Sequence, residues 1–146
     1  MRITYKGDYA LKTILDLALH YNNSPVTSHD LAQRADIPIK FLEQILLDLK
    51  RGGFVESRRG KVGGYLLARH PSRIKLGEII RFIDGHIEPI ACVEKSYKGC
   101  DDITRCVFRE IWEKVTETTS KIIDNITFED LVKRIKNLSS PFIYQI

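Results

Sequence analysis

The 146-residue sequence contains only three cysteines and no apolar run of the roughly 18–20 residues that a membrane-spanning helix needs. Three cysteines cannot all pair within one chain, which argues against a disulfide framework and favours a reducing compartment. The N-terminal segment lacks the long apolar stretch of a secretory signal. We therefore expect a cytoplasmic protein with no membrane partner.

The composition is that of a globular protein. Hydrophobic residues make up 43% of the chain and charged residues 29%, which excludes wholesale disorder. This length corresponds to one domain, or one domain with an extension, and a core of that size needs no covalent staple. The net charge of +4 permits nucleic-acid binding without requiring it.

The positive charge is concentrated between residues 50 and 81. This stretch holds nine basic and two acidic side chains, a net charge of +7, so the rest of the chain carries −3. A basic segment inside a balanced chain is typical of contacts with phosphates. A solvated charged face without a partner has the same composition, so charge alone leaves both interpretations open.

The first half of the chain has the pattern of three helices. Apolar residues recur at helical spacing over residues 8–21, and Thr27 or Ser28 caps a short second helix. A third helix is predicted over residues 38–51. Its apolar stripe consists of Phe41, Leu42, Ile45, Leu46 and Leu49.

Two short segments of alternating polarity, 54–57 and 65–67, follow the third helix. They flank the cationic, glycine-rich residues 58–64, which we interpret as a hairpin tip. The predicted fold is therefore mainly α with a small β-hairpin, in the order of a winged helix-turn-helix. In that architecture the third helix enters the major groove of DNA, and an arginine of the hairpin, or wing, suits a narrow minor groove.

The candidate DNA contacts lie at the cap of the second helix, on the third helix and on the wing. They are Thr27, Ser28, Lys40, Phe41, Glu43, Gln44, Lys50, Arg58, Arg59 and Lys61. Gln44 can bond adenine, whereas Phe41 either touches a thymine methyl group or belongs to the core. Glu43 would repel phosphates or accept from a cytosine amino group. We expect Arg59 to enter a groove while its cationic neighbours hold phosphates.

The second half of the chain is predicted to contain three helices and one long loop. Residues 74–84 form a helix, and residues 86–105 show no sustained period, which indicates a loop. A long helix covers residues 106–125, and Thr127 with Asp130 forms a capping box for a final helix. The apolar stripe of the long helix packs either within the chain or in a twofold dimer that would bind a pseudo-palindromic DNA operator.

These patterns divide the chain into four parts. They are a winged helix-turn-helix domain with its linking helix at 1–84, a cysteine-bearing loop at 85–106, a dimerisation helix and C-terminal helix at 106–138, and a tail at 139–146.

The three cysteines, Cys92, Cys100 and Cys106, lie in or beside the loop. Their spacing is neither the two-residue spacing of structural zinc sites nor that of common ferredoxins. Three soft thiolates on one irregular segment could converge on a soft metal, and nearby basic residues favour the thiolate form. Spacing alone leaves three interpretations open: an iron–sulfur or other metal centre, a thiol redox switch, and inert cysteines.

Three groups of residues resemble the bacterial IscR-like winged-helix regulators. They are Met1-Arg2-Ile3-Thr4 with Lys6-Gly7 and Tyr9-Ala10, then Phe41-Leu42-Glu43-Gln44, then Ser57-Arg58-Arg59-Gly60 with Gly63-Gly64-Tyr65-Leu66-Leu67. The resemblance covers nearly the whole chain. It implies a homodimeric transcription factor whose long helices pair and whose three cysteines hold one iron–sulfur cluster per subunit, 2Fe-2S in preference to 4Fe-4S. The gap of seven residues between the first two cysteines is like the RirA branch.

The fourth ligand departs from the IscR pattern. The resemblance places a histidine three residues after the third cysteine, where this chain has Arg109, whose guanidinium stays protonated and cannot bind a metal. NsrR-like relatives can use an acidic residue of the first helix. Asp8 occupies that place and is the candidate fourth ligand, from the same or the other subunit. Asp8 suits a helix cap or first-turn acid equally well.

The resemblance implies that cluster loading orders the loop and shifts the two DNA-binding heads, with iron, oxygen or nitric oxide as the signal. The alternative is a metal-free thiol regulator of the same fold. We do not expect an enzyme. Cys92 and His86 are the only nucleophile and base that lie close in sequence, and no paired-carboxylate motif supports a catalytic role for them. The glycines of the wing also do not lie between a strand and a helix, as a phosphate loop requires. Repression or activation depends on the position of the operator.

Overall fold

The structure is a computed structural model that describes residues 2–139. Its elements in chain order are α1 (Tyr5–Leu19), α2 (Ser28–Ala35), α3 (Ile39–Arg51), β1 (Val55–Arg58), β2 (Gly64–Leu67), the 3-10 helix η1 (Pro71–Arg73), α4 (Leu76–Asp84), the 3-10 helix η2 (Ala91–Val93), α5 (Val107–Ile123) and α6 (Phe128–Ser139). Within the described range, no helix is both long and apolar enough to span a bilayer. The predicted mainly helical fold with one hairpin is confirmed.

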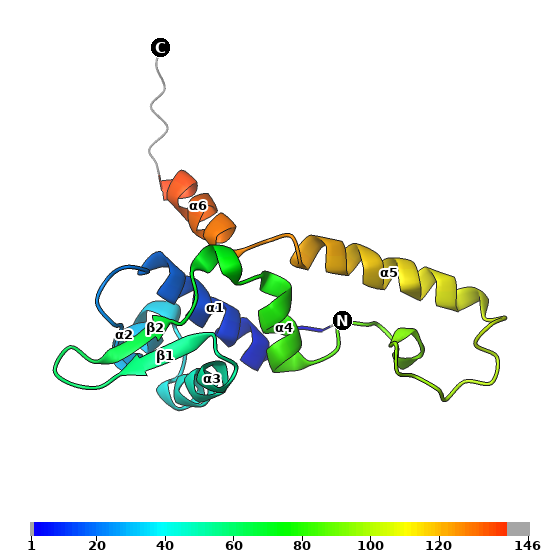
Figure 1. The fold of residues 1–146 in the computed structure, drawn as a ribbon, viewed down its shortest axis with the longest axis horizontal. Coiled ribbons are helices and arrows are strands. Elements are labelled where there is room, and N and C mark those ends of the chain that lie inside the picture. Colours follow the sequence, from blue (N-terminus) through cyan, green and yellow to red (C-terminus); the bar gives the residue numbers. More distant parts are fainter. Residues whose placement is uncertain (1, 140–146) are drawn as a thin grey trace, which may run out of the picture.

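Helices α1, α2 and α3 form the head of the molecule together with the hairpin β1–β2 (Figure 1). The buried stripe of α3 lies in the main core with residues of α1 and α2. The stripe residues Leu42, Ile45, Leu46 and Leu49 are each at most 1% exposed. Burying an aliphatic side chain of this size contributes about 1.5–3 kcal/mol, so this stripe fixes how α3 sits in the head.

The wing is an antiparallel hairpin joined to the segment before α2. Val55 lies opposite Leu67 at its base, and Arg58 lies opposite Gly64 near its tip. Tyr65 exchanges two backbone hydrogen bonds with Val26, of 2.8 and 3.0 Å. A Cβ on Gly64 would come within 2.5 Å of the Val26 carbonyl oxygen, so only glycine allows this close approach.

The first helix begins at Tyr5, three residues before the predicted start, because its cap depends on a distant residue. Thr4 caps α1 by accepting from the Gly7 N–H, and its own N–H donates to the Asp84 carboxylate at 3.0 Å. The Thr4 hydroxyl donates to the same carboxylate. Asp84 is the last residue of α4, so the end of α4 is fastened to the start of α1.

Helix α5 projects from the head: its N-terminal end lies farthest away and its C-terminal end lies beside α4, and α6 then packs against α1 (Figure 1). Arg81 of α4 makes a two-bonded ion pair with Asp124 at 2.5 and 3.0 Å, which anchors the C-terminal end of α5. The capping box predicted for α6 is present: Thr127 N–H donates to Asp130, whose own N–H donates to the Thr127 hydroxyl. The backbone N–H and the hydroxyl of Thr127 both donate to the Asp130 carboxylate and lower the pKa of that carboxyl. Of the predicted tail, only Ser139 lies within the described residues, at the end of α6.

Candidate DNA interface and cysteine loop

The outward face of α3 carries the polar residues expected to contact DNA. Lys40, Glu43 and Gln44 are all exposed. The Gln44 amide donates to Asp48 at 3.4 Å, and Asp48 also pairs with Lys6 of α1 at 2.7 Å. The Lys6 ammonium lowers the pKa of the Asp48 carboxyl. Gln44 therefore lies next to the Lys6–Asp48 ion pair, which connects α3 to α1.

Of the two roles that the sequence left open for Phe41, the structure excludes a place in the buried stripe of α3. Its side chain is 64% exposed, whereas Leu42 and Ile45 are buried. The stripe residues repeat at intervals of three and four, and Phe41 falls at the edge of that face, beside α1. Phe41, Tyr5 and Tyr9 line one open groove of about 470 Å³. Phe41 is therefore a surface residue next to Gln44.

Two candidate DNA contacts, Thr27 at the cap of α2 and Lys50 beside the wing, make hydrogen bonds to nearby residues. Thr27 accepts from the Asp30 N–H at 3.1 Å, and Ser28 is the first residue of α2. Lys50 of α3 donates to Ser57 at 2.7 Å. The Thr27 hydroxyl keeps its own hydrogen as a donor for a phosphate.

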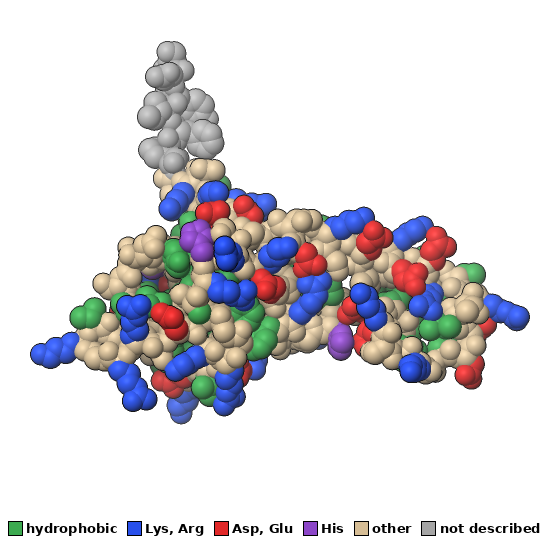
Figure 2. All heavy atoms as spheres, in the orientation of Figure 1, with side chains coloured by type: hydrophobic (Ala, Val, Ile, Leu, Met, Phe, Trp, Pro, Cys, Tyr) green, Lys and Arg blue, Asp and Glu red, His purple; other side chains and the backbone are tan. Residues whose placement is uncertain are grey.

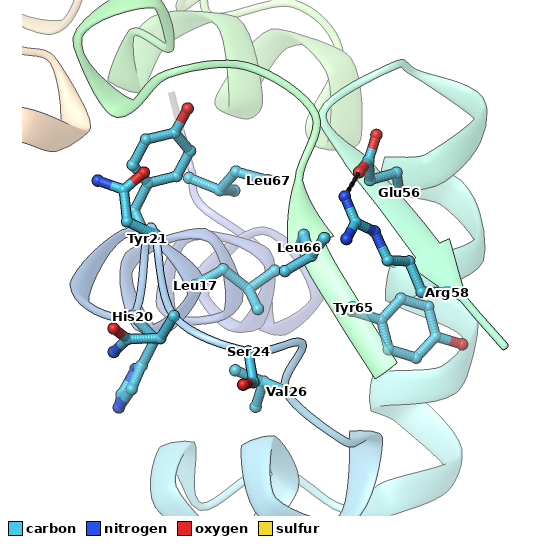
Figure 3. A pocket seen from close by; sticks show the side chains of 12 residues that line it. Leu17, His20, Tyr21, Ser24, Val26, Glu56, Arg58, Tyr65, Leu66 and Leu67 are labelled. Carbon is cyan, nitrogen blue, oxygen red and sulfur yellow. Dashed lines mark ion pairs between the residues drawn. The ribbon is translucent and has the colours of Figure 1, made fainter. Parts of the chain in front are cut away.

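Arg58 differs from the cations at the tip of the wing. It pairs with Glu56 at 3.6 Å on one side of a cavity of about 270 Å³ between the wing and the end of α1 (Figure 3). Arg59 and Lys61 are exposed and, within the described residues, make no hydrogen bond or ion pair. These two side chains can therefore bind phosphates without first breaking an internal pair.

Charge is distributed unevenly over the surface. Lys and Arg side chains gather around β1, β2 and α3, whereas over α5 they alternate with Asp and Glu (Figure 2). The α5 charges pair at i,i+4 spacing, as in Arg109–Glu113 at 2.8 Å and Lys121–Glu117 at 2.7 Å. Around α3 and the wing, positive charge therefore exceeds negative charge, whereas along α5 the two are balanced.

The three cysteines are free thiols on the segment between α4 and α5. Cys92 lies half-buried in η2, Cys100 is exposed, and Cys106 is the half-buried cap of α5. Since η2 contacts α5, the first and third cysteines belong to neighbouring elements. Among residues 2–139, however, no three His, Cys, Asp or Glu side chains gather so as to hold a metal. The donor chemistry fits an iron–sulfur centre, while the convergence of its donors is absent.

The candidate fourth ligand is engaged elsewhere. Asp8 lies half-buried in the first turn of α1 and pairs with Lys12 at 2.7 Å. This is the first-turn position that the sequence also suggested. His86 lies between Glu88 and Glu94, at 3.7 and 3.8 Å from its two ring nitrogens. Neither its spacing nor a helical period singled out His86 in the sequence.

Comparison with known proteins identifies the family. Residues 3–134 match the model of the Rrf2 family, described as an iron-dependent transcriptional regulator. The chain belongs to the Rrf2 family. It is thus a DNA-binding transcriptional regulator and not an enzyme, with a winged helix-turn-helix fold.

The Rrf2 relatives include proteins with different names. The chain is 38% identical over 132 residues to the transcriptional regulator IscR of Yersinia pestis, which covers 90% of this chain and 79% of that protein. The structure of T. potens IscR superposes with a TM-score of 0.78 at 33% identity, covering 96% of this chain and 92% of that one. The structure of CymR, the global cysteine regulator of B. subtilis, also superposes with a TM-score of 0.78. It is 30% identical to this chain, and the match covers 92% of this chain and 98% of that one. Membership of Rrf2 therefore leaves the signal to be argued from the chain itself.

Proposed function

We propose that this Rrf2 protein is a homodimer whose binding to a pseudo-palindromic operator is controlled by one iron–sulfur cluster per subunit. The observation that carries the proposal is the position of Cys92, Cys100 and Cys106. All three are free thiols on one irregular segment, which starts directly after Asp84, the residue that fastens α4 to α1.

The DNA contacts of this regulator come from α3, the wing and the start of α2. Lys40, Glu43 and Gln44 stand on the exposed face of α3 and would read base edges in the major groove. Lys61 and Arg59 are cations at the wing tip that have no partner among residues 2–139. The remaining proposed contacts are Thr27, Ser28, Phe41, Lys50 and Arg58.

Replacing Arg59 with Ala should weaken operator binding by about 1–3 kcal/mol, because the variant loses an arginine contact in a groove. Fluorescence anisotropy with a labelled operator at physiological salt measures this change. Arg134→Ala is the control, since Arg134 is an exposed arginine of α6, away from the wing. An unchanged affinity of the Arg59 variant would remove that residue from the interface.

The proposed homodimer is based on an apolar face of α5 that residues 2–139 leave uncovered. Of the residues of α5, only Ile123, the last one, is buried. The exposed apolar residues are Val107, Phe108, Ile111, Val115 and Ile122, with exposed fractions of 42–76%. Exposed apolar faces of this kind mark protein interfaces, and a twofold axis lets one face cover its copy. Pairing through α5 would place two heads on one operator.

The cysteines would supply three thiolate ligands, and Lys95, Lys98 and Arg105 would favour the thiolate form. When bound, the cluster supplies a redox-sensitive inorganic centre that iron scarcity, oxygen or nitric oxide can degrade. Asp8 remains the proposed fourth ligand, from the same or the other subunit, because Arg109 cannot bind a metal and pairs with Glu113. We propose a 2Fe-2S cluster in preference to 4Fe-4S.

A set of polar contacts connects the start of the cysteine loop to the DNA face. Asp84 bonds the cap residue of α1, and Lys6, two residues further along, pairs with Asp48 of α3. Asp48 in turn accepts from Gln44. A change in the loop that moved the end of α4 would therefore reach Gln44 through rigid helices. The cluster can shift this equilibrium only by its different affinity for the two arrangements.

Anaerobic purification and reconstitution with iron and sulfide tests the cofactor. We expect visible absorption bands and, by analysis of iron and acid-labile sulfide, about one cluster per subunit. A colourless protein after reconstitution would overturn the cluster proposal. It would favour a metal-free thiol regulator, for which the three accessible thiols are equally suited.

A further inference from the structure

We infer that the groove between α1 and α3 binds the apolar edge of a thymine nucleotide in the operator, its 5-methyl group and the adjoining deoxyribose. Tyr5 and Phe41 are then specificity-determining residues for DNA. This inference rests on the proposal that α3 enters the major groove.

The groove has aromatic walls and an apolar floor. It encloses about 470 Å³ and is lined by Tyr5, Lys6, Tyr9, Phe41, Gln44 and Ile45. Ile45 is 1% exposed, whereas Tyr5 is 83% and Phe41 64% exposed. The rings of Tyr5 and Tyr9 lie 6.5 Å apart with 39° between their planes, so α1 contributes one wall. Two large aromatic side chains therefore stand in solvent over a buried floor.

Such an arrangement favours a bound partner over a surface that faces only water. Covering an aromatic ring removes a large apolar area from water, at about 25 cal/mol per Å². Leu42 and Leu46 of α3 are completely buried, whereas Phe41 is 64% exposed, so Phe41 does not serve to fill the core. An uncovered apolar surface beside polar residues is typical of a binding site.

The position of the groove identifies DNA as the occupant. Gln44 lines the groove and also lies at the centre of the exposed face of α3, so the groove continues the DNA-binding face without a break. Lys40, one residue before Phe41, is exposed and carries positive charge that complements the DNA backbone, whereas Lys6 in the groove wall is paired with Asp48. A hydrophobic peptide or metabolite would not call for this charge.

The chemistry of the major groove narrows the occupant to thymine. The 5-methyl of thymine is the apolar group that base pairs present there. The groove is much larger than a methyl group, so the sugar of the same nucleotide would enter with it. Gln44 on the rim of the groove suits adenine. The groove and Gln44 together therefore predict a preference for neighbouring A·T base pairs opposite the N-terminal half of α3.

Replacing thymine by deoxyuridine removes only the methyl group and tests the inference directly. The probe is a duplex that the wild-type protein selects from a random-sequence library, with each thymine replaced in turn. We expect one position in each half-site at which the loss of the methyl weakens binding about fourfold, equivalent to about 0.8 kcal/mol. Replacement in both half-sites should weaken binding about fifteenfold.

The variants Tyr5→Ala and Phe41→Ala complete the test. In each, deoxyuridine at the sensitive position should have no further effect, because the wall that contacts the methyl is gone. Leu138→Ala is the control: Leu138 lies on α6 and is 84% exposed, close to the value for Tyr5. This control should keep the fourfold effect.

Three outcomes would overturn the inference. One is a wild-type Kd for every deoxyuridine duplex that lies within twofold of the Kd for the parent duplex. This outcome does not depend on the folding of any variant. Another is a methyl effect that persists in both alanine variants. The third is a change of oligomeric mass in Tyr5→Ala, which would assign the groove to a protein interface. All three leave the cluster dependence of binding to the unmodified duplex intact, so they are distinguishable from a failure of the proposed function.

Discussion

A double variant with Ile111→Asp and Val115→Asp should be monomeric and should bind its operator about 10²–10⁴-fold more weakly than the wild type. Both side chains are exposed on the uncovered face of α5, at 52% and 42%. Two carboxylates there would have to be buried, unpaired, against the same face of the partner. With the heads separated, the second half-site would be lost as an intramolecular contact, and this accounts for the fall in affinity.

Sedimentation or light scattering gives the mass, and anisotropy gives the operator affinity. Lys121→Glu is the matched control, because it also lowers the net charge by two on α5 but lies beside the apolar face, paired with Glu117. The control should remain a dimer with nearly wild-type affinity. A dimeric Ile111/Val115 variant would show that α5 does not form the interface. The head should fold in both cases, since the substituted side chains are exposed.

The second large effect is expected from replacing Cys92, Cys100 and Cys106 together by Ala. The variant should be colourless after anaerobic reconstitution and should retain almost no iron or sulfide, because it lacks every thiolate ligand. None of the three side chains is fully buried, so the melting temperature of the stripped protein should change little.

A control in the same loop separates ligand loss from loop disturbance. Ser96→Ala with Thr104→Ala changes two exposed polar residues of the segment and leaves all the thiols in place. It should load as the wild type does. Iron and sulfide retained by the triple cysteine variant at the wild-type level would exclude these cysteines as the ligands.

The head was predictable from local signals. The caps, the glycines of the wing and the apolar spacing of α3 act over a few residues, and the elements they indicate are all present. What failed depended on distant contacts. Helix α1 begins at Tyr5 because Asp84, at the far end of α4, completes its cap. The same error hid Tyr5, which the predicted start at residue 8 left outside the helix.

The candidate site was less predictable because it depends on three-dimensional convergence. Cys92 and Cys106 lie on elements in contact, yet the spacing of cysteines in an irregular loop does not determine where their thiols meet. Phe41 illustrates the same limit on a helix, since a residue at the edge of an apolar stripe is buried or exposed according to its neighbour. Here that neighbour is α1, which leaves an open groove.

Control of DNA binding by the cluster is tested by the operator affinity of one anaerobic preparation, measured before and after the cluster is stripped. Salt must be the same in both titrations, because phosphate contacts make binding salt-dependent. We expect the two Kd values to differ by about 5–150-fold, the usual range of coupling between two sites. The triple cysteine variant should give one value under both treatments. Equal Kd values for the loaded and stripped wild-type protein would contradict the account and leave a DNA-binding regulator without control by its cysteine loop.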